Sequence, residues 1–227
     1  MKVLDVKNVS WTRDGVSVLE NMSFLVERQS LVGVTGPNGA GKSSLFEVLM
    51  GWHRTRKGEI EWIGNPVLAL LPQIPFRPMT LPLSVDAFVE MGTWSKTKKA
   101  TPPLTMSEAF EVLGLEPLRN KLVGEISGGE WKRVSLARTL VQAADVFLLD
   151  EPFNYLDLGS EERVGHLLQD LVQTKDKTFL VISHDWHAMT HFFGRVILMN
   201  KKVLADGSPQ TVAALHSDPK HHEWMHP

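Results

Sequence analysis

A glycine-rich segment near the N-terminus has the composition and spacing of a phosphate-binding loop. It fits the pattern G-x-x-x-x-G-K-[ST], with an apolar run at 31–35 before it and a helical pattern at 42–49 after it. Glycines let the backbone curl so that successive N–H groups point at phosphate oxygens. The lysine of such a loop reaches the β- and γ-phosphates, and the next hydroxyl takes a position on Mg²⁺. The residues that we expect to hold phosphates are Gly36, Pro37, Asn38, Gly39, Ala40, Gly41, Lys42, Ser43 and Ser44.

Two adjacent acids follow a second apolar run. Residues 146–149 are all apolar, and Asp150 and Glu151 come directly after them. Ligands of open α/β sheets bind at the carboxyl ends of strands, so we expect Asp150 to hold Mg²⁺ and Glu151 to accept a proton from water. The alternative is a buried strand that ends in solvated acids. The glycine-rich loop argues against that alternative because a Mg²⁺–nucleotide site needs both halves.

The elements that must position these residues follow an α/β pattern. Strand-like segments open the chain at 1–11 and 16–27, and strand and helix patterns alternate after residue 145. Seven of the thirteen prolines fall between Pro66 and Pro103, so that stretch cannot be regular sheet. The insertion at roughly 72–142 is expected to be mostly helical, and the alternation elsewhere predicts a parallel sheet.

Composition excludes several classes of protein. The 227 residues include 24 Lys and Arg against 26 Asp and Glu, and this balance argues against a general nucleic-acid binder. Without cysteine the chain has no disulfide framework and no thiolate zinc site. No apolar stretch reaches the roughly 18–20 residues of a membrane-spanning helix, so we expect a soluble chain that cannot form a pore by itself.

Four further short motifs stand in order along the chain, and with the phosphate loop and the two acids they resemble the motifs of ATP-binding-cassette (ABC) ATPases. The resemblance extends from residue 1 to about residue 215. The four motifs are a Q-loop at Gln73, a signature at Ser127, Gly128, Gly129 and Glu130, a D-loop that ends in Asp157, and a switch histidine at His184.

The resemblance implies a fold. It is an α/β P-loop NTPase (RecA-like) core with an N-terminal antiparallel β subdomain and an inserted α-helical subdomain. The single nucleotide-binding domain, 1–227, would have its core at about 1–71 and 143–215, the helical subdomain at about 72–142, and a His-rich tail at 216–227.

The resemblance also implies a head-to-tail homodimer that encloses two ATP molecules with Mg²⁺. The signature residues Ser127, Gly128, Gly129 and Glu130 would bind the ATP held by the opposite subunit, and Asp157 would lie at the dimer seam. Mg²⁺ would be held by Ser43, Gln73 and Asp150. Catalysis would fall to Glu151, His184 and Gln73.

Two positions depart from the family pattern. The family commonly has Gln at the fifth signature position, where this chain has Glu130, and a carboxylate near phosphate should be mildly unfavourable. The adenine-stacking residue is usually a Tyr on the first strand, and here Trp11 is the candidate. The alternative for Trp11 is a half-buried strand aromatic.

ATP hydrolysis must drive some process, and a chain that cannot cross a membrane by itself would drive transport only through another protein. We expect a separate integral membrane permease to dock near residues 74–95, with a solute-binding protein engaged indirectly, and the chain to be cytoplasmic on the inner face of the membrane. The apolar side chains of that segment either form the docking groove or pack within the helical insertion. They are Ile74, Phe76, Met79, Leu81 and Leu83.

The segments 71–73 and 80–85 resemble the zinc- and manganese-import branch, and we favour zinc. Four tail histidines could bind Zn²⁺, with a disordered polar tail as the alternative; they are His216, His221, His222 and His226. His187 and His191 lie one helical turn apart, but without a third ligand we take them as helix surface. Alternatives are a cassette for another solute, an exporter subunit, or a soluble cassette without a membrane partner. A P-loop kinase is disfavoured because it leaves Ser127-Gly128-Gly129 unexplained.

Overall fold

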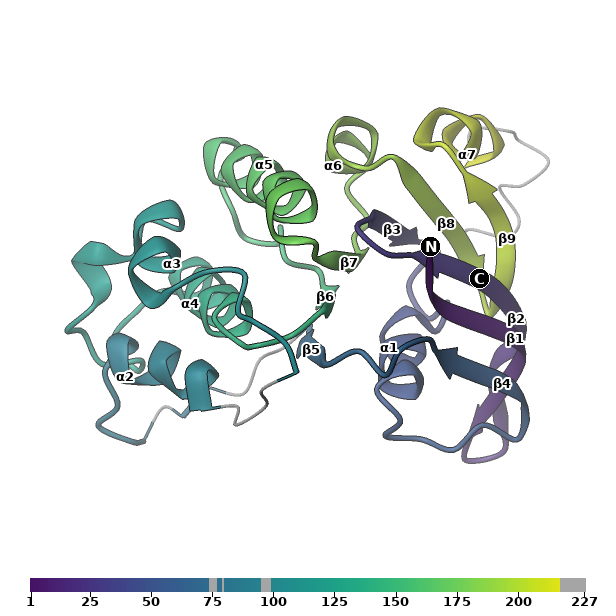
Figure 1. Cartoon of the computed structure of the whole chain (residues 1–227), viewed down its shortest axis with the longest axis horizontal. Helices are drawn as coiled ribbons and strands as arrows, with labels where there is room; N and C mark the ends of the chain where they lie inside the picture. Colours follow the sequence, from purple (N-terminus) through teal and green to yellow (C-terminus); the bar gives the residue numbers. More distant parts are fainter. Residues whose placement is uncertain (74–76, 79, 95–98, 217–227) are drawn as a thin grey trace.

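The computed structural model describes residues 1–73, 77–78, 80–94 and 99–216, with the side chains of 215 and 216 left out. Figure 1 shows a lobe of sheets with flanking helices on the right and a lobe of helices on the left. The strands are β1 (Lys2–Arg13), β2 (Val16–Glu27), β3 (Leu31–Thr35), β4 (Lys57–Trp62), β5 (Leu68–Leu71), β6 (Val146–Asp150), β7 (Thr178–Ile182), β8 (Arg195–Asn200) and β9 (Lys202–Gly207). The helices are α1 (Lys42–Leu49), α2 (Val85–Glu90), α3 (Met106–Val112), α4 (Gly128–Leu140), α5 (Leu158–Lys175), α6 (Trp186–Phe192) and α7 (Pro209–His216).

A six-stranded sheet with the order β5-β6-β7-β3-β8-β9 forms the centre of the molecule. Strands β5, β6, β7, β3 and β8 run parallel to one another, and β9 is antiparallel to β8. Every residue of β3, β6 and β7 is buried, which explains why these strands read as continuous apolar runs. The predicted parallel sheet is confirmed.

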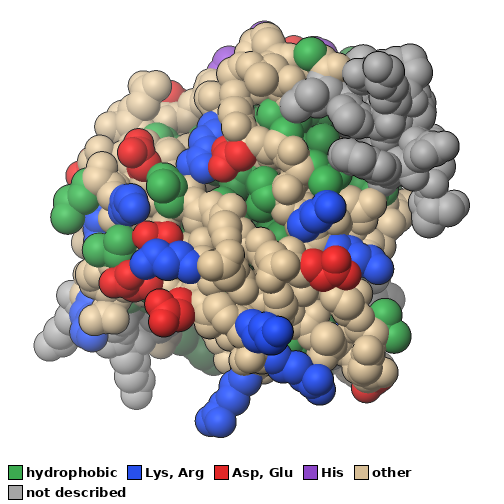
Figure 2. All heavy atoms as spheres, turned by 90° about the vertical axis from the view of Figure 1, so that its right-hand side faces the viewer, with side chains coloured by type: hydrophobic (Ala, Val, Ile, Leu, Met, Phe, Trp, Pro, Cys, Tyr) green, Lys and Arg blue, Asp and Glu red, His purple; other side chains and the backbone are tan. Residues whose placement is uncertain are grey.

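The N-terminal strands form a separate antiparallel sheet with the order β2-β1-β4. One face of this sheet packs with α1 and the central sheet in one apolar core. On the face of the molecule seen in Figure 2, Lys and Arg side chains are interspersed with Asp and Glu. Ion pairs of this sheet join Lys2 and Lys7 to Asp5, and Lys7 to Glu61. The expected fold class, an α/β core with an antiparallel β unit and inserted helices, is confirmed.

The left-hand lobe consists of α2, α3 and α4 with short 3₁₀ turns between them (Figure 1). Thr105 is the N-cap of α3, and its spacing to Glu108 in the sequence gives the reciprocal capping box that the structure contains. An apolar core joins these helices to one face of the central sheet. In the described part of the chain, no helix is long and apolar enough to cross a membrane.

Helices α5 and α6 make a close contact at Gly165. A Cβ atom at Gly165 would lie 2.5 Å from ring atoms of Phe192, whereas a Cβ at Gly159 in the same helix would make ordinary contacts. Phe192 is itself fixed, because it lies at 5.3 Å from the ring of His166 and at 6.4 Å from that of Phe153. The approach of α6 to α5 therefore depends on the absence of a side chain at Gly165.

We predict that Gly165→Ala destabilises the protein although alanine is the better helix former. The clash with Phe192 should lower the free energy of unfolding by about 1–3 kcal/mol, more than the ~0.5–1 kcal/mol that helix propensity returns. Gly159→Ala is the matched control and should be neutral or stabilising. Denaturant unfolding followed by circular dichroism measures both, and equal stability of the two variants would contradict the packing argument.

Candidate functional site

The phosphate loop leaves the carboxyl end of β3 and leads directly into α1. Gly36 has φ 151° and Gly41 has φ 90°, both in the region that favours glycine. A Cβ at Gly36 would collide with the carbonyl oxygen of Met199, and one at Gly41 would lie 2.7 Å from that of Val18. The two glycines are therefore required both by backbone conformation and by the close approach of neighbouring chain.

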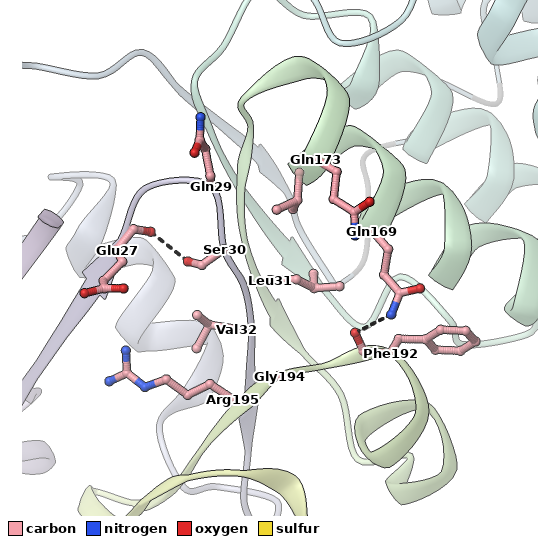
Figure 3. Close-up of a pocket in the computed structure, with 11 residues that line it drawn as sticks. Glu27, Gln29, Ser30, Leu31, Val32, Gln169, Gln173, Phe192, Gly194 and Arg195 are labelled. Carbon is pink, nitrogen blue, oxygen red and sulfur yellow. Dashed lines mark hydrogen bonds between the residues drawn. The ribbon is translucent and has the colours of Figure 1, made fainter. Parts of the chain in front are cut away.

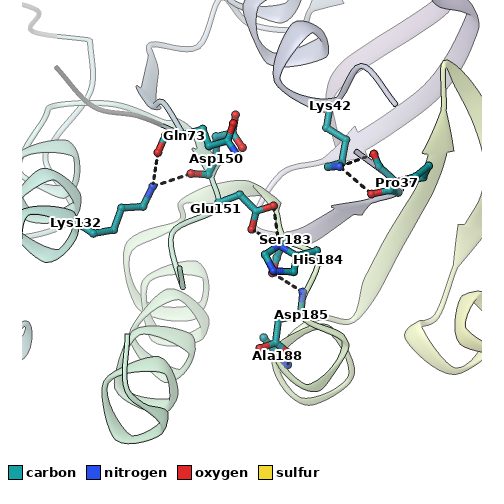
Figure 4. A network of polar contacts seen from close by, with 11 residues as sticks. Pro37, Lys42, Gln73, Lys132, Asp150, Glu151, Ser183, His184, Asp185 and Ala188 are labelled. Atoms are coloured by element: carbon teal, nitrogen blue, oxygen red, sulfur yellow. Dashed lines mark hydrogen bonds and ion pairs between the residues drawn. The ribbon is translucent and has the colours of Figure 1, made fainter. Parts of the chain in front are cut away.

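The Lys42 side chain lies across this loop. Its Nζ donates hydrogen bonds to the carbonyl oxygens of Gly36 at 2.8 Å and Pro37 at 2.9 Å (Figure 4). Burial lowers the pKa of Lys42, while the charges of Glu151 and Asp150 oppose that shift. The ammonium group thus lies at the loop, opposite the two acids.

Asp150 is the last residue of β6, and its side chain is adapted to a cation. Burial raises the pKa of Asp150, and a hydrogen bond from the Ser43 hydroxyl opposes that rise. Its Oδ1 atom is buried and has no hydrogen-bond partner, which is costly unless something else satisfies it. A carboxylate, a hydroxyl and the exposed amide of Gln73 are the hard oxygen donors that Mg²⁺ takes. These residues fit a nucleotide-bound Mg²⁺.

Glu151 and His184 face each other from neighbouring strands. His184 Nδ1 lies 3.1 Å from both carboxylate oxygens of Glu151 (Figure 4). The Glu151 side chain is 6% exposed and that of His184 is 65% exposed. The Glu151 backbone has φ 52°, and its N–H donates to the carbonyl oxygen of Ile182 at the end of β7 at 2.9 Å. The arrangement aims a fixed carboxylate at the phosphate loop, with an imidazole next to it.

Most of these groups line one cavity of about 240 Å³, whereas Gly36, Pro37 and His184 do not. Its lining includes residues 38–44 of the predicted phosphate loop and both predicted acids together with Gln73. The residues that line it are Arg13, Val18, Asn38, Gly39, Ala40, Gly41, Lys42, Ser43, Ser44, Gln73, Asp150 and Glu151.

The signature residues do not line this cavity. Ser127 caps α4 in a reciprocal box: its hydroxyl accepts from Glu130 N at 3.2 Å, and Glu130 Oε2 accepts from Ser127 N at 2.6 Å. The Ser127 N–H lowers the pKa of Glu130. Gly128 borders a second cavity, about 510 Å³ in volume, which shares Gln73 with the first. Glu130 therefore has a structural role, because it completes the N-terminal capping box of α4.

Comparison with known proteins identifies this architecture. The family model described as ABC transporter matches residues 19–154. A manganese transport system ATP-binding protein, MntB of Listeria monocytogenes, is 33% identical over 201 residues, covering 83% of each chain. The chain belongs to the ABC transporter family. Members of this family bind and hydrolyse ATP, and this chain is an ABC-type ATPase.

Other relatives of this ABC ATPase are named for metals too. A zinc import ATP-binding protein, ZnuC of Ehrlichia chaffeensis, is 29% identical over 210 residues, with 92% of this chain and 85% of that protein covered. Among solved structures, a transporter described as of the metal-chelate type, in an inward-facing conformation, superposes with a TM-score of 0.78 at 26% identity, covering 93% and 85% of the two chains. A nucleotide-free ATP-binding cassette gives a TM-score of 0.80 at 22% identity and covers 98% of each chain, which shows the fold alone.

Trp11, expected to stack on adenine, does not line the cavity of the phosphate loop in this ABC ATPase. Trp11 is 7% exposed and its ring stacks on His53 with centroids 4.7 Å apart, so neither ring borders the ATP cavity. Arg13, two residues later on β1, lines the cavity instead. Its guanidinium carbon lies 5.1 Å from the centroid of the Trp11 ring, and its Nη2 lies 2.8 Å from Glu47. Sequence reasoning missed Arg13 because it looked only for an aromatic ring.

The remaining predicted residues separate into described and undescribed ones. Ile74, Phe76 and Met79 of the expected docking segment lie outside the described residues, as do the tail histidines after His216. Leu83 packs against the core of the helical lobe, as the packing alternative has it, whereas Leu81 is exposed and its docking role stays a prediction.

His187 and His191 lie on the surface of α6 with rings stacked 5.8 Å apart, as expected. Among the residues that the structure describes, no group of three or more His, Asp or Glu could hold a metal ion.

A further cavity of about 350 Å³ lies at the amino end of β3, away from the ATP site (Figure 3). Its polar side chains are bonded locally: Gln169 Nε2 donates to the carbonyl oxygen of Phe192 at 2.9 Å, and Ser30 Oγ to that of Glu27 at 2.7 Å. Arg195 at its rim is held by both carboxylate oxygens of Asp206 at 2.6 Å. These side chains therefore hold neighbouring segments of the chain together, and we assign the cavity no ligand.

Proposed function

We propose that Glu151 orients or deprotonates the water that attacks the γ-phosphate of ATP, with His184 as its positioning partner. The observation that carries this proposal is the contact of His184 Nδ1 with both Glu151 oxygens beside the phosphate loop. Mg²⁺, held by Ser43, Asp150 and Gln73 with the nucleotide, would neutralise charge on the phosphates. Lys42 would leave its carbonyl partners for the β- and γ-phosphates.

The signature residues act, in this proposal, on the ATP of a second copy of the chain. Within one chain none of them lines the cavity of the phosphate loop, and Gly128 borders a different cavity at the start of α4, where a helix N-terminus favours anions. Next to them Tyr155 is 84% exposed and Leu158 is 74% exposed, which is unusual for apolar side chains of this size. Asp157 between them caps α5 by accepting from Ser160 N at 2.9 Å. This surface is the proposed homodimer seam.

We propose that Arg13 contacts adenine in place of the aromatic side chain that is usual in the family. A guanidinium is planar and stacks on π-systems, and Trp11 and Glu47 hold this one at the edge of the ATP cavity. Val18, on the paired strand β2, lines the same cavity and provides an apolar neighbour for the base.

We predict that Arg13→Ala weakens ATP binding because a base-stacking partner is lost. Stacking on one side chain is worth about 1–3 kcal/mol, or roughly a fivefold to hundredfold rise in Kd. Inorganic triphosphate, which lacks the base, serves as the control ligand and should bind the variant and the parent alike. Equal ATP affinity of the two proteins, or equal losses for both ligands, would remove Arg13 from the base site.

A second prediction separates chemistry from binding. Glu151→Gln keeps the shape of the side chain but cannot accept the proton, so kcat should fall by at least about a hundredfold while ATP affinity is retained. Lys42→Ala removes a charge-assisted contact to phosphate and should raise the ATP Kd by roughly tenfold or more. ATPase assays and calorimetry measure the two effects, and substantial turnover by Glu151→Gln would remove Glu151 as the base.

We propose that this ATPase drives import of a divalent metal ion, manganese or zinc. The ion would pass through a separate membrane permease, with the ATPase bound at the inner face of the membrane. The names of the relatives support the metal class and include both ions, and the sequence resemblance is likewise to the combined zinc- and manganese-import branch. The histidine-rich tail is the additional reason to favour zinc. The permease would dock near residues 74–95. Exposed Trp52 borders a cavity with Pro72 and Gln73, and Leu81, which follows the Q-loop in the chain, is also exposed. A solute-binding protein would deliver the ion from outside.

Metal content of cells tests this assignment. Deleting the gene should lower accumulation of manganese or of zinc under limitation of that metal, and the parent gene should restore it while Glu151→Gln does not. The metal that responds decides between the two ions. Unchanged content of both metals would contradict metal import and favour another solute or an exporter. Failure of any membrane protein to co-purify in detergent would favour a soluble cassette.

A further inference from the structure

Lys132 is a buried lysine that none of the roles above uses. It lies on α4, five residues after Ser127, and it is 4% exposed. Its Nζ donates hydrogen bonds to the main-chain carbonyl oxygens of Asp150 at 3.0 Å and Gln73 at 3.2 Å (Figure 4). One side chain of the signature helix therefore holds the backbone of two residues whose side chains belong to the proposed Mg²⁺ site.

The segment that contains Gln73 is fastened at a second point. Arg77 donates from Nε and Nη2 to the carbonyl oxygen of Val123 at 2.9 and 2.8 Å, and from Nη2 to that of Ile126. Its guanidinium also lies 5.6 Å from the centroid of the Trp131 ring. Gln73 and Arg77 are thus both attached to α4 or to the turn before it, whereas β5 immediately before Gln73 belongs to the central sheet.

The ammonium group of Lys132 is expensive to bury. Burial lowers its pKa to about 8, and only the charges of Asp150 and Glu151 oppose that shift. An apolar side chain of similar length would avoid this desolvation, as replacements of buried charges in other proteins show. The desolvation of Lys132 is offset by its two hydrogen bonds, which fix the backbone of Gln73 and Asp150 relative to α4.

We propose that Lys132 is a positioning residue for ATP hydrolysis, which holds Gln73 and Asp150 in fixed register with the start of the signature helix. Because both hydrogen bonds go to main-chain oxygens, loss of Lys132 removes one anchor of the backbone at each residue without touching the phosphate loop. Asp150 keeps its pairing with β7, so the larger effect is expected at Gln73. Lys132 does not line the cavity of the phosphate loop, and it borders the second cavity together with Gly128 and Gln73. The inference rests on the proposed roles of Gln73 and Asp150 in the Mg²⁺ site.

A second buried lysine provides a matched control. Lys177 is also 4% exposed, and its Nζ donates to the carbonyl oxygens of Thr101 at 2.7 Å and Ala144 at 2.9 Å. It therefore repeats the same kind of two-carbonyl bond away from the ATP cavity. Lys132→Met and Lys177→Met remove equivalent bonds to carbonyl oxygens, so a purely structural role would change the melting temperature and the activity of both variants alike.

The test is steady-state ATPase kinetics of the full chain, with circular dichroism to show that each variant is folded at the assay temperature. We expect Lys132→Met to lower kcat by about tenfold or more while KM for ATP stays within threefold, and Lys177→Met to keep kcat within twofold. Lys132→Gln has an amide nitrogen one bond closer to the backbone and cannot span both carbonyls. It should lower kcat at least threefold and serves if the Met variant does not fold.

Two results would overturn the inference: kcat of the folded Lys132 variants within twofold of the parent, or an equal loss of kcat in Lys177→Met. An absence of ATPase activity in the parent chain would instead contradict the proposed function. The failure of one proposal is therefore distinguishable from the failure of the other.

Discussion

The adjacency of β6, β7 and β3 in a buried parallel sheet is the constraint on which the site depends. Parallel strands release their carboxyl ends at one edge, so the phosphate loop, the Asp150–Glu151 pair and His184 emerge side by side. A sheet buried on both faces cannot slip in register without moving polar groups into the core. The site geometry is therefore set by strand pairing, and the loops add the functional groups.

Charge balance is the second requirement, because four ionisable groups share a poorly solvated region. Lys42 and Lys132 approach from two sides, and Asp150 and Glu151 lie between them. Burial lowers the pKa of both lysines, and the acids counteract this. Each lysine is satisfied by two main-chain carbonyl oxygens, so the cations hold the chain while the carboxylates stay available for Mg²⁺ and water.

Local rules in the sequence were the most reliable. The glycines of the phosphate loop and the capping box at Thr105 depend on residues a few positions apart, and the structure has both. The place of Trp11 outside the cavity could not be predicted because its partner, His53, is distant in sequence and because register shifts flank it in the β1–β2 pairing, where residue type alone does not show which side chain reaches a cavity. Lys132 carried no signal, since its acceptors are main-chain oxygens of Gln73 and Asp150 that only the tertiary fold brings near.

The two helix starts that we propose as anion sites, those of α1 and α4, border different cavities of one chain. Two copies arranged head to tail could place both against the same phosphate, which would make hydrolysis depend on association. Gln73 borders both cavities, and through Lys132 its backbone is tied to α4. If a partner docks near residues 74–95 as we propose, displacement of Gln73 would be felt by α4 and by the backbone of Asp150, because Lys132 is hydrogen-bonded to both residues.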